Sequence, residues 1–239
     1  MNEQERTRWV ELAQQDPAAL STRFVLDLNW LDAARYVFDR NCAEAIQIPD
    51  AVETNVEFII KANRRQEEAL HREFVRRFHN YVASAKTMVD NTRAVRTRWE
   101  TQEFCQQCDE RIEDTRRKPV VRFLQEMRNA MHHSQLPQIH RVTTFQPVPP
   151  GPNTVVPRLR LMVSTSALAA MHDWSRLARA YIDESADQYN VDMTVVVKGY
   201  HAVADALHEW FITEVKKARR GLLDDFDARR SELARLSSQ

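Results

Sequence analysis

Glycine is almost absent from this chain, and its scarcity limits the folds that the chain can adopt. Only 3 of the 239 residues are glycine, and the stretch from Gln66 to Arg116 contains neither glycine nor proline. Tightly connected strands need glycine in their turns, whereas long helices joined by a few loops do not. Ala, Glu, Arg, Leu and Gln are plentiful instead. These features predict a mainly α-helical fold.

Apolar residues recur at helical spacing along most of the sequence. The pattern predicts a bundle of about seven or eight helices, in a single domain over residues 1–221 with a polar C-terminal helix or tail over residues 222–239. Pro119 and Pro137 delimit the central helix, which begins at Val120. The helices are expected over residues 3–15, 17–45, 51–65, 66–116 (one or two helices), 120–137, 167–188 and 192–220.

Three places are expected to interrupt or end a helix. Ile46-Gln47-Ile48-Pro49 should end the helix that begins at Pro17, because proline lacks a backbone N–H group. A break or kink in the long stretch after Gln66 is expected at Ser84 or at Asp90-Asn91-Thr92, whose side chains compete for backbone hydrogen bonds. Gly221 should end the last long helix, because glycine is favoured just past a helix C-terminus.

Residues 139–164 differ from the rest of the chain in composition and in the spacing of their apolar residues. Two partly alternating, β-branched arms flank Pro149-Pro-Gly-Pro-Asn153, a segment made almost entirely of turn residues. This pattern predicts a β-hairpin inserted after the central helix. Pro147 and Pro157 cannot donate to a strand ladder, so the hairpin should be frayed, short, or at the edge of a sheet.

Charge and cysteine content favour a cytoplasmic protein. Lys plus Arg equals Asp plus Glu, 34 against 34, so no global field attracts nucleic acid, although residues 61–128 carry 16 basic and 11 acidic residues, a local excess of +5. Three cysteines with no disulfide spacing fit a reducing compartment. The longest uncharged apolar stretch, Leu161 to Met171, is too short to span a membrane, and no targeting segment is visible.

The central helix carries the cluster of residues that most resembles a chemical site. Its apolar face is expected to include Val120, Phe123, Leu124, Met127 and Met131. Arg128 should lie at the edge of this face with His132 one turn further on, so these two side chains could touch, whereas Asn129 and His133 should face solvent. A guanidinium group can hold a phosphate with two hydrogen bonds, and an imidazole can move a proton near neutral pH.

The spacing Arg128-Asn129-x-x-x-His133 resembles the signature of the HEPN superfamily, all-helical domains that include many metal-independent endoribonucleases. The resemblance covers this helix and the all-α background. It implies that Arg128 and His133 act on the scissile phosphate and the ribose 2′-hydroxyl group, with Asn129 as the accompanying polar residue. It also implies a homodimer in which two motif helices form one composite site. For some members, a protein antidote or accessory subunit would be expected.

Several alternatives stay open. His132 could replace His133 as the proton acceptor. The protein could also be a non-catalytic helical binding or assembly module, in which Arg128 pairs with an acidic neighbour and both histidines interact with the helix C-terminus. Cys105 and Cys108 lack the further ligands of a zinc site and are expected to be half-buried thiols. We therefore expect no metal and no cofactor. The substrate or ligand implied by the resemblance is RNA, and no membrane association is expected.

Overall fold

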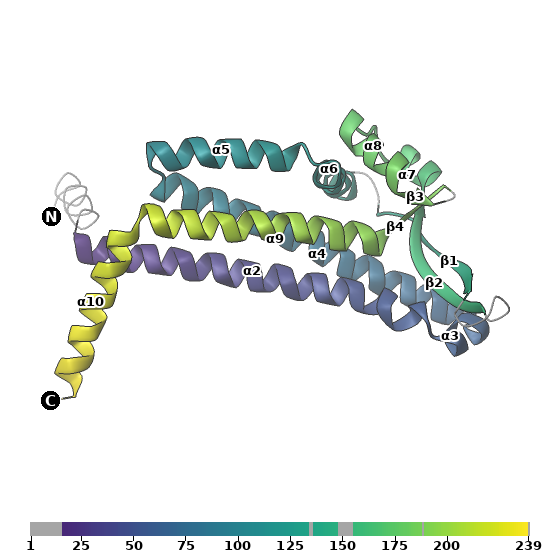
Figure 1. Ribbon diagram of the computed structural model, residues 1–239. Coiled ribbons are helices and arrows are strands. Elements are labelled where there is room, and N and C mark those ends of the chain that lie inside the picture. The colour runs from purple at the N-terminus through teal and green to yellow at the C-terminus, as the bar shows by residue number, and fades with distance from the viewer. Residues whose placement is uncertain (1–15, 134–135, 148–154, 188, 239) are drawn as a thin grey trace, which may run out of the picture.

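The computed structural model describes residues 16–133, 136–147, 155–187 and 189–238 (Figure 1). These residues form helices α2 to α10 and one four-stranded antiparallel sheet. The prediction of a mainly α-helical fold with an inserted hairpin is confirmed. The nine helices within the described residues exceed the predicted seven or eight, because the segment expected as one helix over 167–188 forms two and the C-terminal segment also forms a helix. The two helices over 66–116 agree with the prediction of one or two. The helix predicted over residues 3–15 lies outside the described residues.

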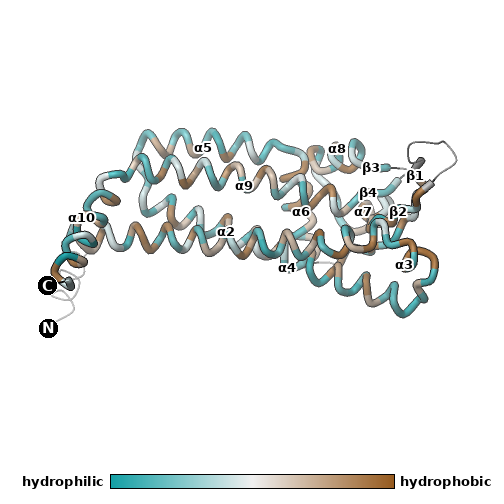
Figure 2. The backbone as a smooth tube through the Cα atoms, turned by 60° about the horizontal axis from the view of Figure 1, so that its bottom comes forward, coloured by the Kyte–Doolittle hydropathy of each residue, from teal (hydrophilic) through white to brown (hydrophobic). Residues whose placement is uncertain are grey.

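Three long helices run side by side along the molecule (Figure 1). They are α2 (Pro17–Glu53), α4 (Arg64–Trp99) and α9 (Met193–Ala218), with α5 (Gln102–Arg116) packed along α9. Hydrophobic and polar residues alternate repeatedly along the tubes of these helices in Figure 2, as expected when only one side of each helix is buried. Short α3 (Val56–Lys61) links α2 to α4.

The predicted helix breaks at Pro49, Ser84 and Asp90 are wrong. Helix α2 continues through Pro49 to Glu53, and α4 continues through Ser84 and the Asp90 triplet to Trp99. Pro49 and Val52 are buried, and the apolar contact of this last part of α2 offsets the backbone hydrogen bond that proline cannot make. The break falls instead at Thr101, whose hydroxyl group accepts a hydrogen bond from the Phe104 N–H group and begins α5.

The predicted hairpin consists of β1 (Ile139–Pro147) and β2 (Val155–Ser164), paired from Ile139↔Val163 to Pro147↔Val155. Strand β1 is at the edge of the sheet, as its proline suggested. Two short strands that the sequence analysis missed complete the sheet in the order β1-β2-β4-β3; they are β3 (Ala186–Asp187) and β4 (Asn190–Asp192). Tyr189, between them, has a φ of 74°.

The helices after the hairpin also differ from the prediction. The single helix expected over residues 167–188 is divided into α7 (Thr165–Met171) and α8 (Arg176–Ser185) by an extended residue, His172. Gly221 does not end the preceding helix; it lies within α10 (Arg220–Ser237), and no described glycine has a positive φ. Helix α10 leaves the bundle at an angle (Figure 1).

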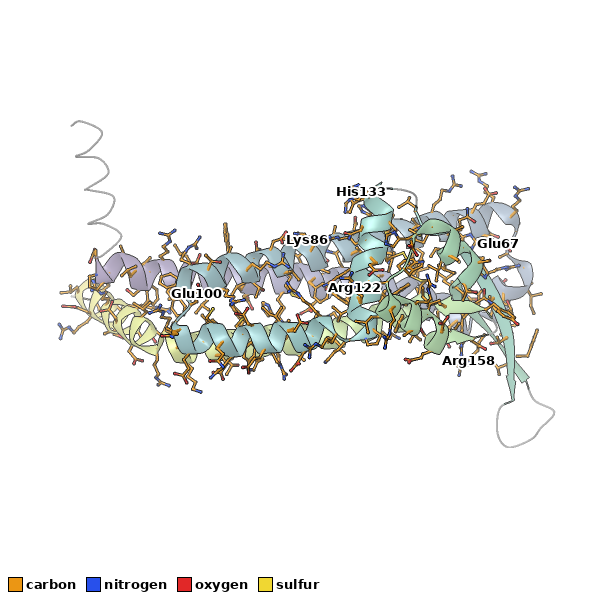
Figure 3. All side chains as sticks on the ribbon, turned by 90° about the horizontal axis from the view of Figure 1, so that it is seen from above. Glu67, Lys86, Glu100, Arg122, His133 and Arg158 are labelled. Atoms are coloured by element: carbon orange, nitrogen blue, oxygen red, sulfur yellow. The ribbon has the colours of Figure 1, made fainter. Side chains whose placement is uncertain are left out.

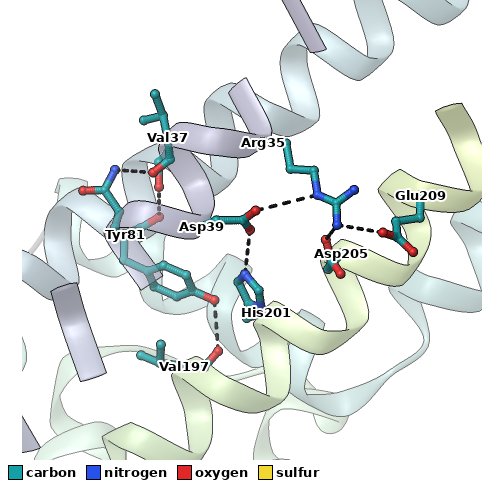
Figure 4. Close-up of polar contacts among 10 residues, drawn as sticks. Arg35, Val37, Asp39, Tyr81, Val197, His201, Asp205 and Glu209 are labelled. Atoms are coloured by element: carbon teal, nitrogen blue, oxygen red, sulfur yellow. Dashed lines mark hydrogen bonds and ion pairs between the residues drawn. The ribbon is translucent and has the colours of Figure 1, made fainter. Parts of the chain in front are cut away.

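Buried polar contacts fix the long helices against one another. Asp27 on α2 is 5% exposed and accepts hydrogen bonds from Arg98 and from the Trp99 indole N–H group, each at 2.6 Å. Further along α2, Arg35 forms ion pairs with Asp205 (2.6 Å) and Glu209 (2.8 Å) of α9. In the same region, Asp39 accepts from His201 and the Tyr81 hydroxyl group donates to Val197 (Figure 4).

Candidate functional site

Helix α6 (Pro119–His133) carries the predicted motif and crosses the long helices, since it is seen nearly end-on in Figure 1 and along its length in Figure 3. Phe123, Leu124 and Met127 anchor it in the core, as predicted. Val120 and Met131, also expected in the core, are only half-buried. The helix is therefore held firmly along one side, and its polar residues project from a fixed support.

Arg128 and Asn129 contact each other. The Arg128 guanidinium group donates to the Asn129 side-chain oxygen at 2.6 and 3.3 Å, and within the described residues Arg128 has no ion pair. The expected acidic partner of Arg128 is absent from the described chain, because Glu126, the nearest carboxylate on α6, is paired with Arg122 at 2.5 Å. The charge of Arg128 is thus available to a ligand.

The two histidines of the motif helix do not pair with Arg128 within the described chain. His132 and His133 are both exposed at the end of α6, and neither is hydrogen-bonded to Arg128. The His132 ring instead makes an edge contact with the ring of His79 on α4, with 6.0 Å between centroids. His133 projects at the far end of α6 from Arg122 in Figure 3. One described chain therefore brings Arg128 and Asn129 together but not the predicted Arg–His pair.

Arg128 and Asn129 line a cleft with a volume of about 360 Å³ between α4, α6, α9 and the C-terminal end of α5. The cleft is rich in cationic side chains. Its basic residues come from three helices, α4, α5 and α6, and the acidic residue Glu126 is the exception in the lining. The five cationic residues are Lys86, Arg93, Arg116, Arg122 and Arg128.

Only part of this positive charge is neutralised locally. Asp90 pairs with Lys86 and, at 3.6 Å, with Arg93, and Glu126 pairs with Arg122. Five cationic groups less these two carboxylates leave a formal charge of +3. Arg116, like Arg128, has no ion pair among the described residues. A concave surface with this charge attracts anions, and arginine suits carboxylate and phosphate groups.

Glu126 has a structural role at the edge of the cleft. Its side chain is almost fully buried, and it accepts a hydrogen bond of 2.9 Å from the Ser175 N–H group at the start of α8. Burial raises the pKa of the Glu126 carboxyl group, but the bonds from Ser175 and the charge of Arg122 outweigh burial and leave this pKa below its ordinary value. Glu126 therefore stays ionised and fixes α8 and Arg122 beside the cleft.

Tyr200 of α9 is a candidate residue that was not predicted from the sequence. It is 6% exposed, lines the cleft, and its hydroxyl group has no hydrogen-bond partner in the described chain. Burial raises the pKa of Tyr200 to about 12, although the charge of Arg128 opposes this effect. The hydroxyl group is therefore a permanent donor at neutral pH. No signal in the sequence distinguishes Tyr200 from a core tyrosine.

The remaining features concern the cysteines, metal binding and membrane spanning. Cys108 is buried and Cys105 is partly exposed, both as free thiols, and burial raises the pKa of Cys108 to about 11. Among the described residues, no group of three or more His, Cys, Asp or Glu side chains could hold a metal ion. No helix in the same part of the chain is long and apolar enough to cross a membrane.

Comparison of the chain with protein-family models, with curated proteins and with solved structures gives no match. The function of the cleft therefore has to be inferred from its own residues.

Proposed function

We propose that this protein binds RNA at the cationic cleft and cleaves it without a metal ion, as a HEPN-like endoribonuclease. The observation that carries the proposal is Arg128, a guanidinium group with no acidic partner in the described chain, in a cleft with a formal charge of +3. A phosphodiester is the anion that such a cleft meets along RNA, and arginine binds it with two parallel hydrogen bonds.

Each residue of the motif has a defined role in this proposal. His133 removes the proton from the ribose 2′-hydroxyl group, and the resulting oxygen attacks the phosphorus atom. Arg128 stabilises the additional negative charge of the phosphorane, and Asn129 orients the guanidinium group through its side-chain oxygen. The 5′-oxygen leaves with a proton from His132 or from solvent. The products carry a 2′,3′-cyclic phosphate and a 5′-hydroxyl group.

A homodimer would supply the contact that one chain lacks. His132 and His133 are exposed at the end of α6, where the corresponding helix of a second copy could bring a histidine to Arg128. We therefore propose that two α6 helices face each other in the cytoplasmic enzyme. A protein antidote or accessory subunit would bind the same exposed end of the helix.

The alternative function is that of a non-catalytic binding module. It is favoured by the separation of both histidines from Arg128 in the single chain, where the contact of His132 is with His79. In this case the cationic cleft would bind an anionic partner without cleaving it, and His133 would be dispensable.

The test is incubation of the purified protein with mixed cellular RNA in the presence of EDTA. We expect cleavage that leaves 2′,3′-cyclic phosphate ends and that is lost in Arg128→Ala and in His133→Ala. Loss of a general base or of one charge-stabilising group typically slows a reaction by about 100-fold or more. The melting temperature of Arg128→Ala should not change, because this side chain has no ion pair to lose within the described chain.

Three controls separate the possible outcomes. Arg65→Ala removes one exposed positive charge outside the cleft and should leave cleavage unchanged. His132→Ala identifies which of the two rings acts. Light scattering on the same samples reports whether the protein is a dimer. Absence of cleavage by the wild type, or cleavage that survives both single mutations, would contradict the proposal.

A further inference from the structure

An apolar pocket adjoins the cationic cleft. It has a volume of about 90 Å³ and lies between α4, α5, α6 and α9. Its wall consists mainly of hydrophobic side chains, among them Met88, Ile112, Leu207 and Phe211. A cavity needs only about 10–15 Å³ to hold a water molecule, so this pocket has room for a short hydrocarbon chain.

The pocket and the cleft share one boundary. Five residues line both, and these include two arginines and two groups able to form hydrogen bonds. A ligand that fills the pocket must therefore pass or contact these polar groups. The shared residues are Val89, Arg93, Arg116, Gln125 and Tyr200.

We infer that the pocket and the cleft together bind a small amphipathic anion, in which a carboxylate or phosphate group is attached to a short hydrocarbon chain. The anionic group contacts Arg93 and Arg116 at the boundary, and the chain occupies the pocket. This inference does not depend on cleavage of RNA by the same protein.

Charge selects the head group of the ligand. Arg116, in the last turn of α5, has no ion pair in the described chain, and Arg93 has only a 3.6 Å contact with Asp90. A bound anion would give both guanidinium groups a partner. A cationic head group would be repelled. An uncharged molecule would gain only the burial of its chain.

The apolar wall of the pocket favours a ligand whose uncharged part is a hydrocarbon chain. A nucleobase carries several donors and acceptors, and their burial against apolar side chains without partners would be unfavourable. His208, which is 3% exposed, also forms part of the wall, and burial lowers the pKa of this histidine, so its ring is neutral at pH 7. A neutral, mostly apolar wall suits a hydrocarbon chain.

The test measures binding of hexanoate to the full chain by isothermal titration calorimetry. The matched probes are acetate, which lacks the chain, hexan-1-ol, which lacks the charge, and hexylamine, which carries the opposite charge. We expect hexanoate to bind at least about tenfold more tightly than any of the three. Hexyl phosphate reports whether phosphate or carboxylate is the preferred head group. Equal binding of hexan-1-ol and hexanoate would overturn the inference.

Two pairs of variants locate the site. Arg116→Gln should weaken hexanoate binding about tenfold, whereas Arg117→Gln, which removes the same charge next to the pocket but outside its lining, should not. Leu207→Trp fills the pocket from a half-buried position and should abolish binding, whereas Ala206→Trp adds the same side chain to the exposed side of α9. Unchanged binding in both Arg116→Gln and Leu207→Trp, with normal melting temperatures, would overturn the inference.

Discussion

Two arginines on α6 differ in whether they form an ion pair, because their neighbours on the helix differ. Arg122 has Glu126 four residues later and forms an ion pair with it. Arg128 has no acidic residue at the corresponding position, which is occupied by His132, and its hydrogen bonds go to Asn129. The structural interpretation of Arg128, in which it pairs with an acidic neighbour, is therefore not supported by its contacts. The spacing of charges could have indicated this difference.

Asp27 is a buried charge whose removal should be costly. In Asp27→Ala, the Trp99 indole N–H group and one side of Arg98 lose their acceptor. Arg98 is one-third exposed and can recover water, so we expect a loss of about 2–3 kcal/mol in the free energy of unfolding, measured by urea denaturation. Asp32→Ala, which removes an exposed carboxylate from the same helix, should change it by less than about 0.5 kcal/mol.

At the scale of elements, helix existence was predicted more reliably than helix ends. Most apolar residues whose spacing predicts α2, α4 and α9 lie in or against the core, although Trp30 and Val37 of α2 are exposed, and the two arms of the hairpin pair as expected. The end predicted at Pro49 was wrong, because tertiary burial outweighs the local preference of one residue. Helix α9 ends at Ala218, within two residues of the predicted end, but Gly221 lies in the next helix and does not cap it. The short β3–β4 pair has only five residues and no apolar periodicity of its own, so it could not be foreseen.

Gly221 offers a test of its position inside α10. A Cβ atom at this residue would have no neighbour within 4 Å, and the glycine does not have a positive φ. Gly221→Ala should therefore stabilise the helix by about 0.5–1 kcal/mol and raise the melting temperature by about 2 °C. If Gly221 instead ended α9 in a left-handed conformation, the same substitution would lower the melting temperature. Differential scanning calorimetry distinguishes the two signs.

At the scale of the whole molecule, the bundle contains two groups of buried side chains along its length. The larger group joins α2, α4, α6 and α9 to the sheet and to α7 and α8, and the smaller one joins α2, α4, α5 and α9. The cleft and the apolar pocket lie where α6 crosses the long helices. Residues from distant parts of the sequence, such as Lys86, Arg128 and Tyr200, therefore meet at one place.

The buried His208 and the half-buried His71 should make the stability of the fold depend on pH. Burial lowers the pKa of His208, which faces Arg35, Asp32 and Asp39 from α2 and Asp205 from α9, and also that of His71. The unfolded chain, with an ordinary histidine pKa of about 6.5, then binds more protons than the folded chain. The contribution of the two neutral histidines to the free energy of unfolding should be fully present above pH 6.5. It should decrease as the pH falls below 6.5.

The measurement is thermal unfolding at pH 7.5, 6.5 and 5.5. We expect the melting temperature of the wild type to fall over this range and that of His208→Gln to fall less, because one of the two responsible groups is absent. His133→Gln, at an exposed position, serves as the control and should behave like the wild type. Parallel curves for His208→Gln and the wild type would show that His208 does not contribute.

The sequence by itself determined the helical class, the place of the hairpin and the buried side of α6, because these depend on glycine content and on the periodicity of apolar residues. It also identified Arg128 and Asn129 as polar residues on a firmly packed helix. The tertiary structure alone decided that Arg93, Arg116 and Tyr200 join them around a cleft. Spacing along one helix fixes only neighbours on that helix, whereas a cleft depends on how separate helices cross, and this is set by the packing of their side chains.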